Sequence, residues 1–550
     1  MKQYITALLL SCCLGVYAQE NKPATFVPPF SFPLTFSGNF GEIRSNHFHG
    51  GLDFKTGGSG GKPVRALADG YVSRISVTNG SGHVLEVRYN NGYTTINRHL
   101  SAFMPAVNKQ IDDLQYEKEN WEVEMILQPG EYPVKAGQQI AYSGNTGYSF
   151  GPHLHLDVIE TATGDFVDPL PFFKNNVKDT HAPRAEGIML FPIPGEGVVD
   201  GSERIISFSP SSNKLIEAWG VIGSGLKAHD YMDGVNNHYG VYSVALTVDG
   251  EEVFRSTVDR FSRDENRMIN SWTHGQYMKS FIDPGNTLRM LKASNGNRGL
   301  ITIDQERDYL FQYTLKDVFG NTSHCQFTVK GKRQPIEPLT VRDKYYFLWN
   351  KTNYLQEPGM SLVVPKGMLY DNVALNYRAK ADSGVIAFTY QLNDKATPLH
   401  SGCELRIGLR RKPIADSTKY YVAYIAPNGN KSSVGGKYKD GFMTASINHL
   451  GTYTVAIDTV PPQIIPVNQN SWGRNGKVVY RFKDNATGIA SYKGTIDGKY
   501  ALFGRRNLGN GNWECILDPK HVKKGGSHVV EMTATDGCGN TSVSSAKFIW

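Results

Sequence analysis

The chain has 550 residues, of which 40% are hydrophobic and 20% are charged, and it carries a net charge of +7. This length exceeds what a single hydrophobic core ordinarily supports, so we expect three or four globular domains. Glycine is abundant, aromatic residues make up 11%, and long helical patterns are scarce, which favours a mainly β protein with many turns. Beyond the first residues, no apolar run approaches the roughly 20 residues of a membrane span, which excludes a transmembrane helix there.

The first residues have the layout of an export signal. Lys2 gives a basic start, an apolar stretch covers Ile5–Leu10, and small residues around Ala18 mark a cleavage site. We therefore expect residues 1–18 to be a signal peptide. Two alternatives stay open: a lipoprotein anchored through Cys12, for which the apolar run is short, and a buried first strand of a cytosolic protein.

A short motif, His49-Gly50-Gly51-Leu52-Asp53, follows in the next fifty residues. On an extended strand, residues four apart lie roughly 13 Å from each other, too far to bind one small cation with ligand bonds of about 2 Å. Two adjacent glycines disfavour a helix, but they let the chain bend so that the histidine and the aspartate can converge. The alternative is a surface turn with an incidental histidine and aspartate.

Residues 64–93 show a strand, turn and strand pattern. Alternating side chains are interrupted by Asn79-Gly80 and by Asn91-Gly92, dipeptides that are typical of tight hairpin turns. We expect a compact antiparallel β domain over residues 19–176.

Residues 104–133 interrupt this β pattern. Val107, Ile111 and Leu114 recur at helical spacing, and alternation then begins at Trp121, which predicts an inserted helix and strand. The later part of the insertion carries seven acidic residues and one lysine. It is either a solvated decoration or, because long insertions often border sites, a lid or groove wall.

The segment His153-Leu154-His155-Leu156-Asp157-Val158 alternates strictly, which predicts a strand with both imidazoles and the carboxylate on one face. Alone, the commoner alternative is a strand with hydrogen-bonded structural histidines. With the motif at His49, however, the segment supplies imidazoles and a carboxylate and no cysteine lies nearby. Three such ligands plus water are the arrangement of a catalytic zinc. His99, taken singly, is more typical of a structural histidine.

The remainder of the chain contains an internal repeat. Four anchors recur in the same order, with a proline boundary first, an Asp-Gly hairpin between, and a Gly-Asn turn before the last strand. The pattern resembles immunoglobulin-like sandwiches of bacterial surface proteins and predicts such domains at residues 177–333 and 458–550, flanking a further β-rich domain at 334–457. The paired anchors are Asp179–Pro183 with Asp458–Pro462, Asp230 with Asp484, Thr247–Gly250 with Thr495–Gly498, and Asp317–Ser323 with Asp536–Ser542.

Four cysteines remain after the expected signal peptide, at positions 325, 403, 515 and 538. Exported proteins meet oxidising surroundings, which permits disulfides. We predict a disulfide between Cys515 and Cys538, because both fall in the last domain. The alternative is that all four stay unpaired.

Three motifs in order resemble the lysostaphin-type zinc endopeptidases of peptidoglycan. They are the motif at His49, then His99-Leu100-Ser101, then Ser143-Gly144-Asn145-Thr146-Gly147 followed by Gly151-Pro152-His153-Leu154-His155. The resemblance covers about residues 30–173. It implies one Zn²⁺ per chain, held by His49, Asp53 and His155, with His99 and His153 as catalytic histidines outside the metal shell.

Two further residues near these motifs are candidates for a role in the site. Arg98 stands where relatives usually carry a small residue, and it either contacts a substrate carboxylate or points to solvent. Asp157 either orients an imidazole that binds the metal or is an exposed strand carboxylate.

The resemblance implies an exported zinc metalloendopeptidase that hydrolyses peptide cross-links between peptidoglycan stem peptides, in the periplasm or at the surface of a bacterium. We expect no nucleic-acid partner. The positive charge gathers in residues 176–550, so the C-terminal domains are candidates for contact with the wall or with a cell-envelope protein. The alternatives are a catalytically silent domain, or a peptidase that is accessory to a cell-surface adhesion protein.

Overall fold

The computed structural model describes residues 25–212, 214–339, 345–381, 386–505 and 511–550. The expected signal peptide and Cys12 lie outside the described residues. Within this part of the chain, no helix is both long enough and apolar enough to span a bilayer.

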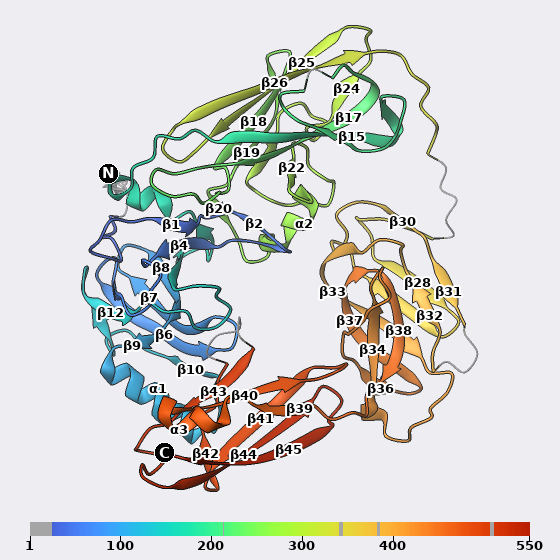
Figure 1. The fold of residues 1–550 in the computed structure, drawn as a ribbon. Coiled ribbons are helices and arrows are strands. Elements are labelled where there is room, and N and C mark those ends of the chain that lie inside the picture. Colours follow the sequence, from blue (N-terminus) through green and yellow to red (C-terminus); the bar gives the residue numbers. More distant parts are fainter. Residues whose placement is uncertain (1–24, 213, 340–344, 382–385, 506–510) are drawn as a thin grey trace, which may run out of the picture.

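The described chain is mainly β, and four large clusters of buried apolar side chains mark four domains (Figure 1). We call them the first (25–176), second (177–339), third (345–457) and fourth (458–550) domains. The expectation of a mainly β protein with antiparallel sheets is confirmed.

The first domain is built on one antiparallel sheet whose central strands carry the histidine motifs. In spatial order its strands are β1 (Phe36–Gly38), β4 (Gly51–Lys55), β13 (His153–Glu160), β8 (Tyr93–Leu100), β7 (Gly82–Tyr89), β6 (Gly70–Thr78) and β10 (Val123–Ile126). A second, small sheet contains β5 (Pro63–Arg65), β12 (Gln139–Tyr142) and β9 (Ala102–Phe103). The other elements are β2 (Ile43–Arg44), β3 (His47–Phe48), α1 (Pro105–Glu117), β11 (Pro133–Val134), β14 (Phe166–Val167) and the 3₁₀ helix η1 (Leu170–Asn176).

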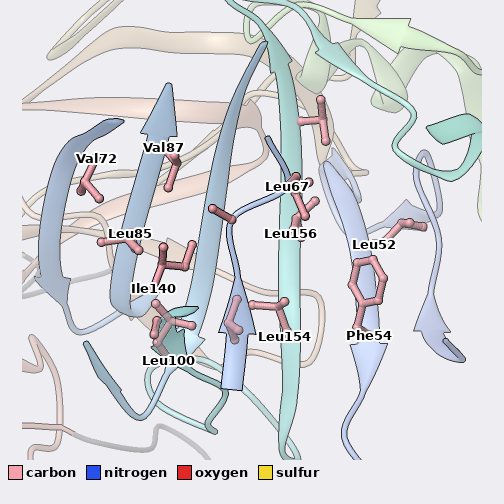
Figure 2. Close-up of a cluster of buried hydrophobic side chains, with 14 of the residues drawn as sticks. Leu52, Phe54, Leu67, Val72, Leu85, Val87, Leu100, Ile140, Leu154 and Leu156 are labelled. Carbon is pink, nitrogen blue, oxygen red and sulfur yellow. The ribbon is translucent and has the colours of Figure 1, made fainter. Parts of the chain in front are cut away.

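Alternation along β4 and β13 separates an apolar face from a polar face. Five apolar side chains of these strands are 0% exposed and lie in the core of the first domain, and Figure 2 labels four of them. Burial of such a side chain contributes roughly 1.5–3 kcal/mol, so the core decides which way each strand faces. The intervening residues, among them Asp53 and His155, therefore point to the opposite face. The buried residues are Leu52, Phe54, Leu154, Leu156 and Val158.

The second domain has one large sheet, in which the parallel pairing of β17 with β26 joins two halves. In spatial order its main strands are β16 (Ile206–Phe208), β15 (Arg184–Val199), β17 (Ile216–His229), β26 (Thr322–Gly331), β25 (Asp308–Lys316), β18 (Ser243–Val248), β19 (Glu251–Thr257) and β23 (Leu291–Ala293). Shorter elements are β20 (Arg260–Phe261), η2 (Glu265–Met268), α2 (Ile269–Trp272), β21 (Thr273–His274), β22 (Tyr277–Lys279) and β24 (Ile301–Ile303).

Two five-stranded sheets enclose the core of the third domain. One contains β28 (Asn353–Glu357), β29 (Met360–Val364), β33 (Thr397–Gly408), β37 (Phe442–Leu450) and β36 (Lys437–Lys439). The other contains β31 (Arg378–Lys380), β32 (Thr389–Gln391), β38 (Thr452–Ile457), β34 (Tyr420–Ile425) and β35 (Lys431–Ser433). The pair β27 (Tyr345–Phe347) and β30 (Val373–Leu375) and the short helix η3 (Ser417–Lys419) complete it.

The fourth domain consists of a three-stranded and a four-stranded antiparallel sheet around one core. The first contains β39 (Gln463–Pro466), β40 (Lys477–Lys483) and β43 (Asn512–Ile516), and the second β42 (Lys499–Ala501), β41 (Ile489–Ile496), β44 (Ser527–Asp536) and β45 (Thr541–Ile549). The short helices η4 (Gln469–Ser471) and α3 (Trp472–Asn475) lie between β39 and β40. That the repeated domains are immunoglobulin-like stays a prediction.

The internal repeat is visible in the hydrogen bonds of the second and fourth domains. The Asp249 and Asp497 backbones have φ of 52° and 51°, and the following glycines are also left-handed, as a tight hairpin of this type requires. The Asn321 amide donates to the carbonyl oxygen of Asp179 (3.2 Å), and that of Asn540 donates to the carbonyl oxygen of Asp458 (3.1 Å). These equivalent hydrogen bonds connect the last hairpin of each domain to the segment through which the chain enters that domain.

The insertion forms the predicted helix α1 and strand β10, and its outer surface packs on the fourth domain. Tyr116 stacks on His521 with ring centroids 3.6 Å apart, and Lys493 forms an ion pair with Glu119. Trp121 is 3% exposed, and a Cβ placed on Gly504 would lie 2.1 Å from its ring. The solvated-decoration hypothesis is therefore wrong for this surface, because it is an interface between domains.

Each domain contacts the next one along the chain, and the fourth contacts the first, so the four domains form a closed ring that we call the circuit (Figure 1). Strand β14 of the first domain pairs with β20 of the second. The Tyr370 hydroxyl of the third domain donates to the carbonyl oxygen of Arg267 in the second (2.8 Å), and Lys419 of the third donates to the carbonyl oxygen of Cys538 in the fourth (3.0 Å). The fourth domain then meets the insertion of the first.

The predicted disulfide between Cys515 and Cys538 is not formed, so that prediction was wrong. Cys515 lies in β43 and is buried in the core of the fourth domain. Cys538 lies between β44 and β45 and packs against Tyr421 and Ala423 of the third domain. The two side chains therefore face different cores, which their spacing in the sequence does not reveal.

Candidate metal centre

Strand pairing brings together three residues of the two histidine motifs. His155 in β13 lies directly opposite Asp53 in β4, and His49 lies just before β4. His155 Nδ1 is 2.9 Å from Asp53 Oδ1 and 3.1 Å from His49 Nε2, and His49 Nε2 is 3.1 Å from Asp53 Oδ1. The three atoms converge on one point, so these residues form a candidate metal centre.

The two glycines between His49 and Asp53 make room for neighbouring groups. A Cβ on Gly50 would lie 2.9 Å from Asp157 Oδ1, and one on Gly51 would lie 2.2 Å from the carbonyl oxygen of Leu156. Neither glycine has a positive φ. The expected bend is thus achieved with ordinary backbone angles, and the glycines are needed because β13 and Asp157 approach so closely.

The donor atoms fit a cation. His49 Nδ1 donates to the carbonyl oxygen of Asn39 (2.6 Å), and His155 Nε2 lies 2.7 Å from Asp157 Oδ1. In the neutral form of each ring, the other nitrogen then turns its lone pair toward Asp53 Oδ1. Burial lowers the pKa of His155, but Asp157 and Asp53 outweigh burial and raise it to about 9, so a bound cation would have to displace a proton from this ring. Lone pairs and a carboxylate that face one another in this way suit a metal ion, and two imidazoles with one carboxylate leave a tetrahedral zinc one position for water.

The electrostatics of Asp53 agree with this fit. Burial by itself raises the pKa of the Asp53 carboxyl, but the nearby imidazoles of His49, His153 and His155 outweigh burial and hold the pKa well below its usual range. The carboxylate is therefore ionised and available as a ligand.

Asp157 connects Arg98 to the candidate ligand His155. Asp157 is 1% exposed, and its Oδ2 accepts hydrogen bonds from Arg98 Nε (2.8 Å), while Arg98 Nη1 donates to Ser81 Oγ (3.0 Å). Burial alone raises the pKa of Asp157, but His155 and Arg98 reverse that effect and lower it. The exposed-carboxylate alternative for Asp157 was therefore wrong. Arg98 turns inward onto Asp157, an arrangement that neither sequence expectation included.

His99 and His153 lie side by side next to the three converging atoms. Their ring centroids are 4.9 Å apart, and His153 Nε2 is 3.5 Å from Asp53 Oδ1. His99 Nδ1 donates to the carbonyl oxygen of Thr146 (2.8 Å), and His153 Nδ1 donates to that of Gly151 (2.8 Å). A carbonyl oxygen only accepts, so each neutral ring carries its proton on Nδ1 and a lone pair on Nε2.

His99 combines a strained backbone with a strongly lowered pKa. Its φ is 60°, in the left-handed region, which costs roughly 1–3 kcal/mol for a residue other than glycine and is typical of functional sites. Burial first, and then the neighbouring His155 and His153, lower the pKa of His99 to about 3. Its imidazole therefore stays neutral at ordinary pH.

The segment before His49 is held by the second domain. Asn39 donates from its amide to the carbonyl oxygen of Gly240 (2.9 Å) and accepts from the Gly240 N–H (2.8 Å). The Phe48 N–H donates to Asn266 Oδ1 (2.6 Å). The sequence analysis missed Asn39, and no local pattern marks it, because its partner lies 201 residues away.

A pair of exposed aromatic side chains lies on the loop whose carbonyl oxygens accept hydrogen bonds from His99 and His153, the two outer histidines. Tyr148 is 63% exposed and Phe150 is 83% exposed, with ring centroids 5.2 Å apart. The loop also supplies the carbonyl oxygens of Thr146 and Gly151. These aromatics fall within the Gly-Asn-Thr-Gly motif region, but nothing in their residue types alone marks them as functional.

Comparisons with known proteins match parts of the chain. The chain is 33% identical over 153 residues to an uncharacterized metalloprotease of Haemophilus influenzae, covering 28% of this chain and 25% of the relative. It is 31% identical over 128 residues to the DD-carboxypeptidase/endopeptidase Mpg of Neisseria meningitidis, 23% of each chain. It is 31% identical over 168 residues to the glycyl-glycine endopeptidase ALE-1 of Staphylococcus capitis, 29% of this chain and 38% of the relative.

The chain thus spans about a quarter to two fifths of the length of these curated relatives. Among solved structures, the catalytic domain of lysostaphin from Staphylococcus simulans is 29% identical and superposes with a TM-score of 0.19, covering 25% of this chain and 89% of that one. A family model described as a Zu5-like domain matches residues 344–458, the β-rich segment whose fold the sequence patterns left open.

The relatives carry peptidase names, and the first domain of this chain has the three motifs in order, with the candidate metal ligands drawn together in its sheet. Over part of its length, the chain is thus similar to proteins named as metalloproteases and endopeptidases, lysostaphin among them.

Proposed function

We propose that the protein is an exported zinc metalloendopeptidase that hydrolyses peptide cross-links of bacterial peptidoglycan. The observation that carries the proposal is the convergence of His49 Nε2, His155 Nδ1 and Asp53 Oδ1, with two further histidines beside them. Relatives named as endopeptidases, one of them a DD-carboxypeptidase/endopeptidase and another a glycyl-glycine endopeptidase, support the substrate class.

His49, Asp53 and His155 would hold the zinc. When bound, zinc supplies a Lewis acid and lowers the pKa of a coordinated water to roughly 7. Asp157 fixes the ring of His155 and favours the tautomer that leaves Nδ1 free, and Arg98 holds Asp157 in turn.

His99 and His153 are placed to handle the proton. Both present an unprotonated Nε2 beside the centre, so either can accept a proton from the attacking water. His153 Nε2 is 3.5 Å from Asp53 Oδ1, so the carboxylate stabilises the charge that His153 gains when it takes up a proton. We assign proton transfer mainly to His153 and orientation of the reacting groups mainly to His99.

The aromatic pair is the part of this surface best suited to hold substrate. Tyr148 and Phe150 are exposed and rest on the loop that positions both outer histidines. Exposed aromatic side chains bind ligands with little loss of conformational entropy. Their joint replacement by alanine is expected to raise KM, with kcat and metal content changed little.

The test is digestion of purified cross-linked peptidoglycan by the zinc-loaded protein, with products separated by mass. We expect uncross-linked peptides, and the product masses identify the bond. The chelated protein and the His153→Ala variant, which is expected to keep its zinc, serve as controls. Release of the same peptides by these controls, or no release by the zinc-loaded protein, would contradict the proposal.

A further inference from the structure

Three aspartates come together in each of the two repeated domains, outside the metal centre described above. In each cluster, one carboxylate oxygen from every residue lies within 4.8 Å of the other two. The members occupy equivalent places, since one precedes the first strand, one follows β17 or β40, and one lies at the last hairpin turn. The first cluster is Asp179, Asp230 and Asp317, and the second is Asp458, Asp484 and Asp536.

These carboxylates are buried with little positive charge beside them. The Asp179 side chain is 0% exposed, and Asp230 and Asp317 are each 3% exposed. In the described part of the chain, the ion pair recorded for the six aspartates is His181 Nδ1 with Asp179 Oδ1, at 4.0 Å. Buried carboxylates ordinarily pair with a cation or coordinate a metal, and among the described residues no lysine or arginine forms an ion pair with these six.

Hydrogen bonds hold part of each cluster and leave particular oxygens without a donor. Asp317 Oδ1 accepts from the Asn321 N–H (2.8 Å), which fixes that carboxylate. Asp179 Oδ2 and Asp230 Oδ1, although buried, have no hydrogen-bond partner. The same is true of Asp484 Oδ1 in the second cluster. The first cluster therefore contains two oxygens, and the second cluster one, that are withdrawn from water without a donor to replace it.

The first cluster is unfavourable without a counter-ion. Burial, reinforced by Asp317 and Asp179, raises the pKa of Asp230 to about 8. Burial likewise raises the pKa of Asp179 to about 6, with Asp317 adding to the effect. A bound cation would remove the repulsion that favours these protonated forms.

We propose that each cluster binds one Ca²⁺ ion. The donors are oxygens alone, which suits a hard cation, whereas zinc prefers nitrogen and sulfur. Calcium–oxygen bonds are about 2.3–2.6 Å long, so two ligands of one ion lie at most about 5 Å apart, and the separations within each cluster satisfy this limit. Calcium also accepts irregular geometry and fills remaining positions with backbone carbonyls and water.

The consequence concerns the junctions between domains. Asp179 lies in the segment that follows η1 of the first domain, and Asp458 directly follows β38 of the third domain. The other two ligands of each cluster belong to the body of the next domain. An ion at each cluster would therefore fasten a connecting segment to the domain it enters and stiffen two of the junctions in the circuit.

Equilibrium dialysis of the full, zinc-loaded chain against about 1 mM Ca²⁺, with metal analysis, tests the number of sites. We expect two Ca²⁺ per chain. Asp230→Asn and Asp484→Asn should each lower that number to one and weaken the affected site at least tenfold, and the double variant should bind none. Asp308→Asn, at an exposed carboxylate in the second domain, should keep both ions.

Thermal unfolding separates loss of a site from loss of the fold. In Ca²⁺-free buffer the asparagine variants should unfold at or above the wild-type temperature, because a repelling charge is gone. With Ca²⁺, only the wild type and Asp308→Asn should gain the full stabilisation. No binding by the wild type, equal binding by the variants, or binding of Mg²⁺ in preference to Ca²⁺ would overturn the proposal. None of these results would alter the peptidase assignment.

Discussion

Asp157 orients the ring of the candidate ligand His155 and is itself held in place by a residue of the neighbouring strand. Its carboxylate lies 2.7 Å from His155 Nε2 and also accepts hydrogen bonds from Arg98. Asp157→Asn keeps the shape of the side chain and removes the charge, so we expect zinc affinity to fall about 10–100-fold. Competition with a chromophoric chelator at fixed pH measures this. Glu160→Gln, on the same strand, is the matched control and should leave the affinity unchanged.

Substitutions at the five histidine and aspartate positions of the candidate centre should have two kinds of effect: some should lower activity and keep the zinc, and others should lose both. His99→Ala and His153→Ala are expected to lower kcat about 100-fold or more while keeping one zinc per chain, because proton transfer by a positioned side chain contributes about 10²–10⁴-fold. His49→Ala should lose the metal together with the activity. Metal analysis of the same preparations decides between these groups, and loss of zinc from His153→Ala would contradict the assignment.

The environment of Asp168 leads us to expect that the stability of the folded protein depends on pH. The side chain is 8% exposed, and burial, aided by Asp259, raises the pKa of Asp168 to about 7. Its pKa in the unfolded chain is about 3.9. Below about pH 4 both states are protonated and the group has no effect. As pH rises toward 7 the unfolded chain ionises while the folded protein keeps the proton, so stability falls.

Asp168→Asn removes this dependence and should therefore stabilise the protein more at high pH than at low pH. We expect the difference in unfolding free energy between variant and wild type to grow by about 2–4 kcal/mol from pH 4 to pH 8. Chemical denaturation in the two buffers provides the measurement. A difference that stays constant with pH would show that Asp168 titrates normally.

Local motifs explain why so much of the centre could be predicted from the sequence. The spacing in His153-Leu154-His155 places both imidazoles on one face of a strand whatever surrounds it. Asp157 lies on the same face for the same reason. The partners of Arg98 and Asn39 could not be predicted, because Ser81, Asp157 and Gly240 meet them only after the sheet and the second domain have assembled.

Among the elements, the insertion departs most from its sequence pattern. Its acidic residues indicated a solvent-facing surface, and the helix and strand were predicted within a few residues of α1 and β10. Its function as an interface was not predictable, because Glu119 and Lys493 are 374 positions apart. Sequence periodicity carries no information about contacts between segments so far apart. The pattern therefore predicted the helix and the strand of the insertion but not the domain that they contact.

Gly504 offers a direct test of this interface. Because a Cβ there would lie 2.1 Å from the Trp121 ring, Gly504→Ala should loosen the contact between the fourth domain and the insertion. We expect faster hydrogen exchange in α1 and β10. Gly526→Ala is the matched control, since its Cβ would meet His528 at an ordinary 3.7 Å. Equal exchange rates in the two variants would show that the interface does not depend on this close approach.

At the scale of the whole molecule, the candidate metal centre lies in a domain that two other domains contact. The second domain binds the segment before His49 through Asn39 and Asn266, and the fourth domain covers the insertion. The sequence predicted several β domains along the chain. It did not predict the circuit, because the contacts that close it join residues of distant domains (Figure 1).

Closure of the circuit has a consequence for how the protein is made. The ribosome releases the first domain early, with Tyr116 and Trp121 of the insertion in place and their covering partners not yet synthesised. Leu502 even belongs to the hydrophobic core of the first domain. The first domain, although synthesised first, therefore reaches its final packing only after the fourth domain has been made and has folded against it.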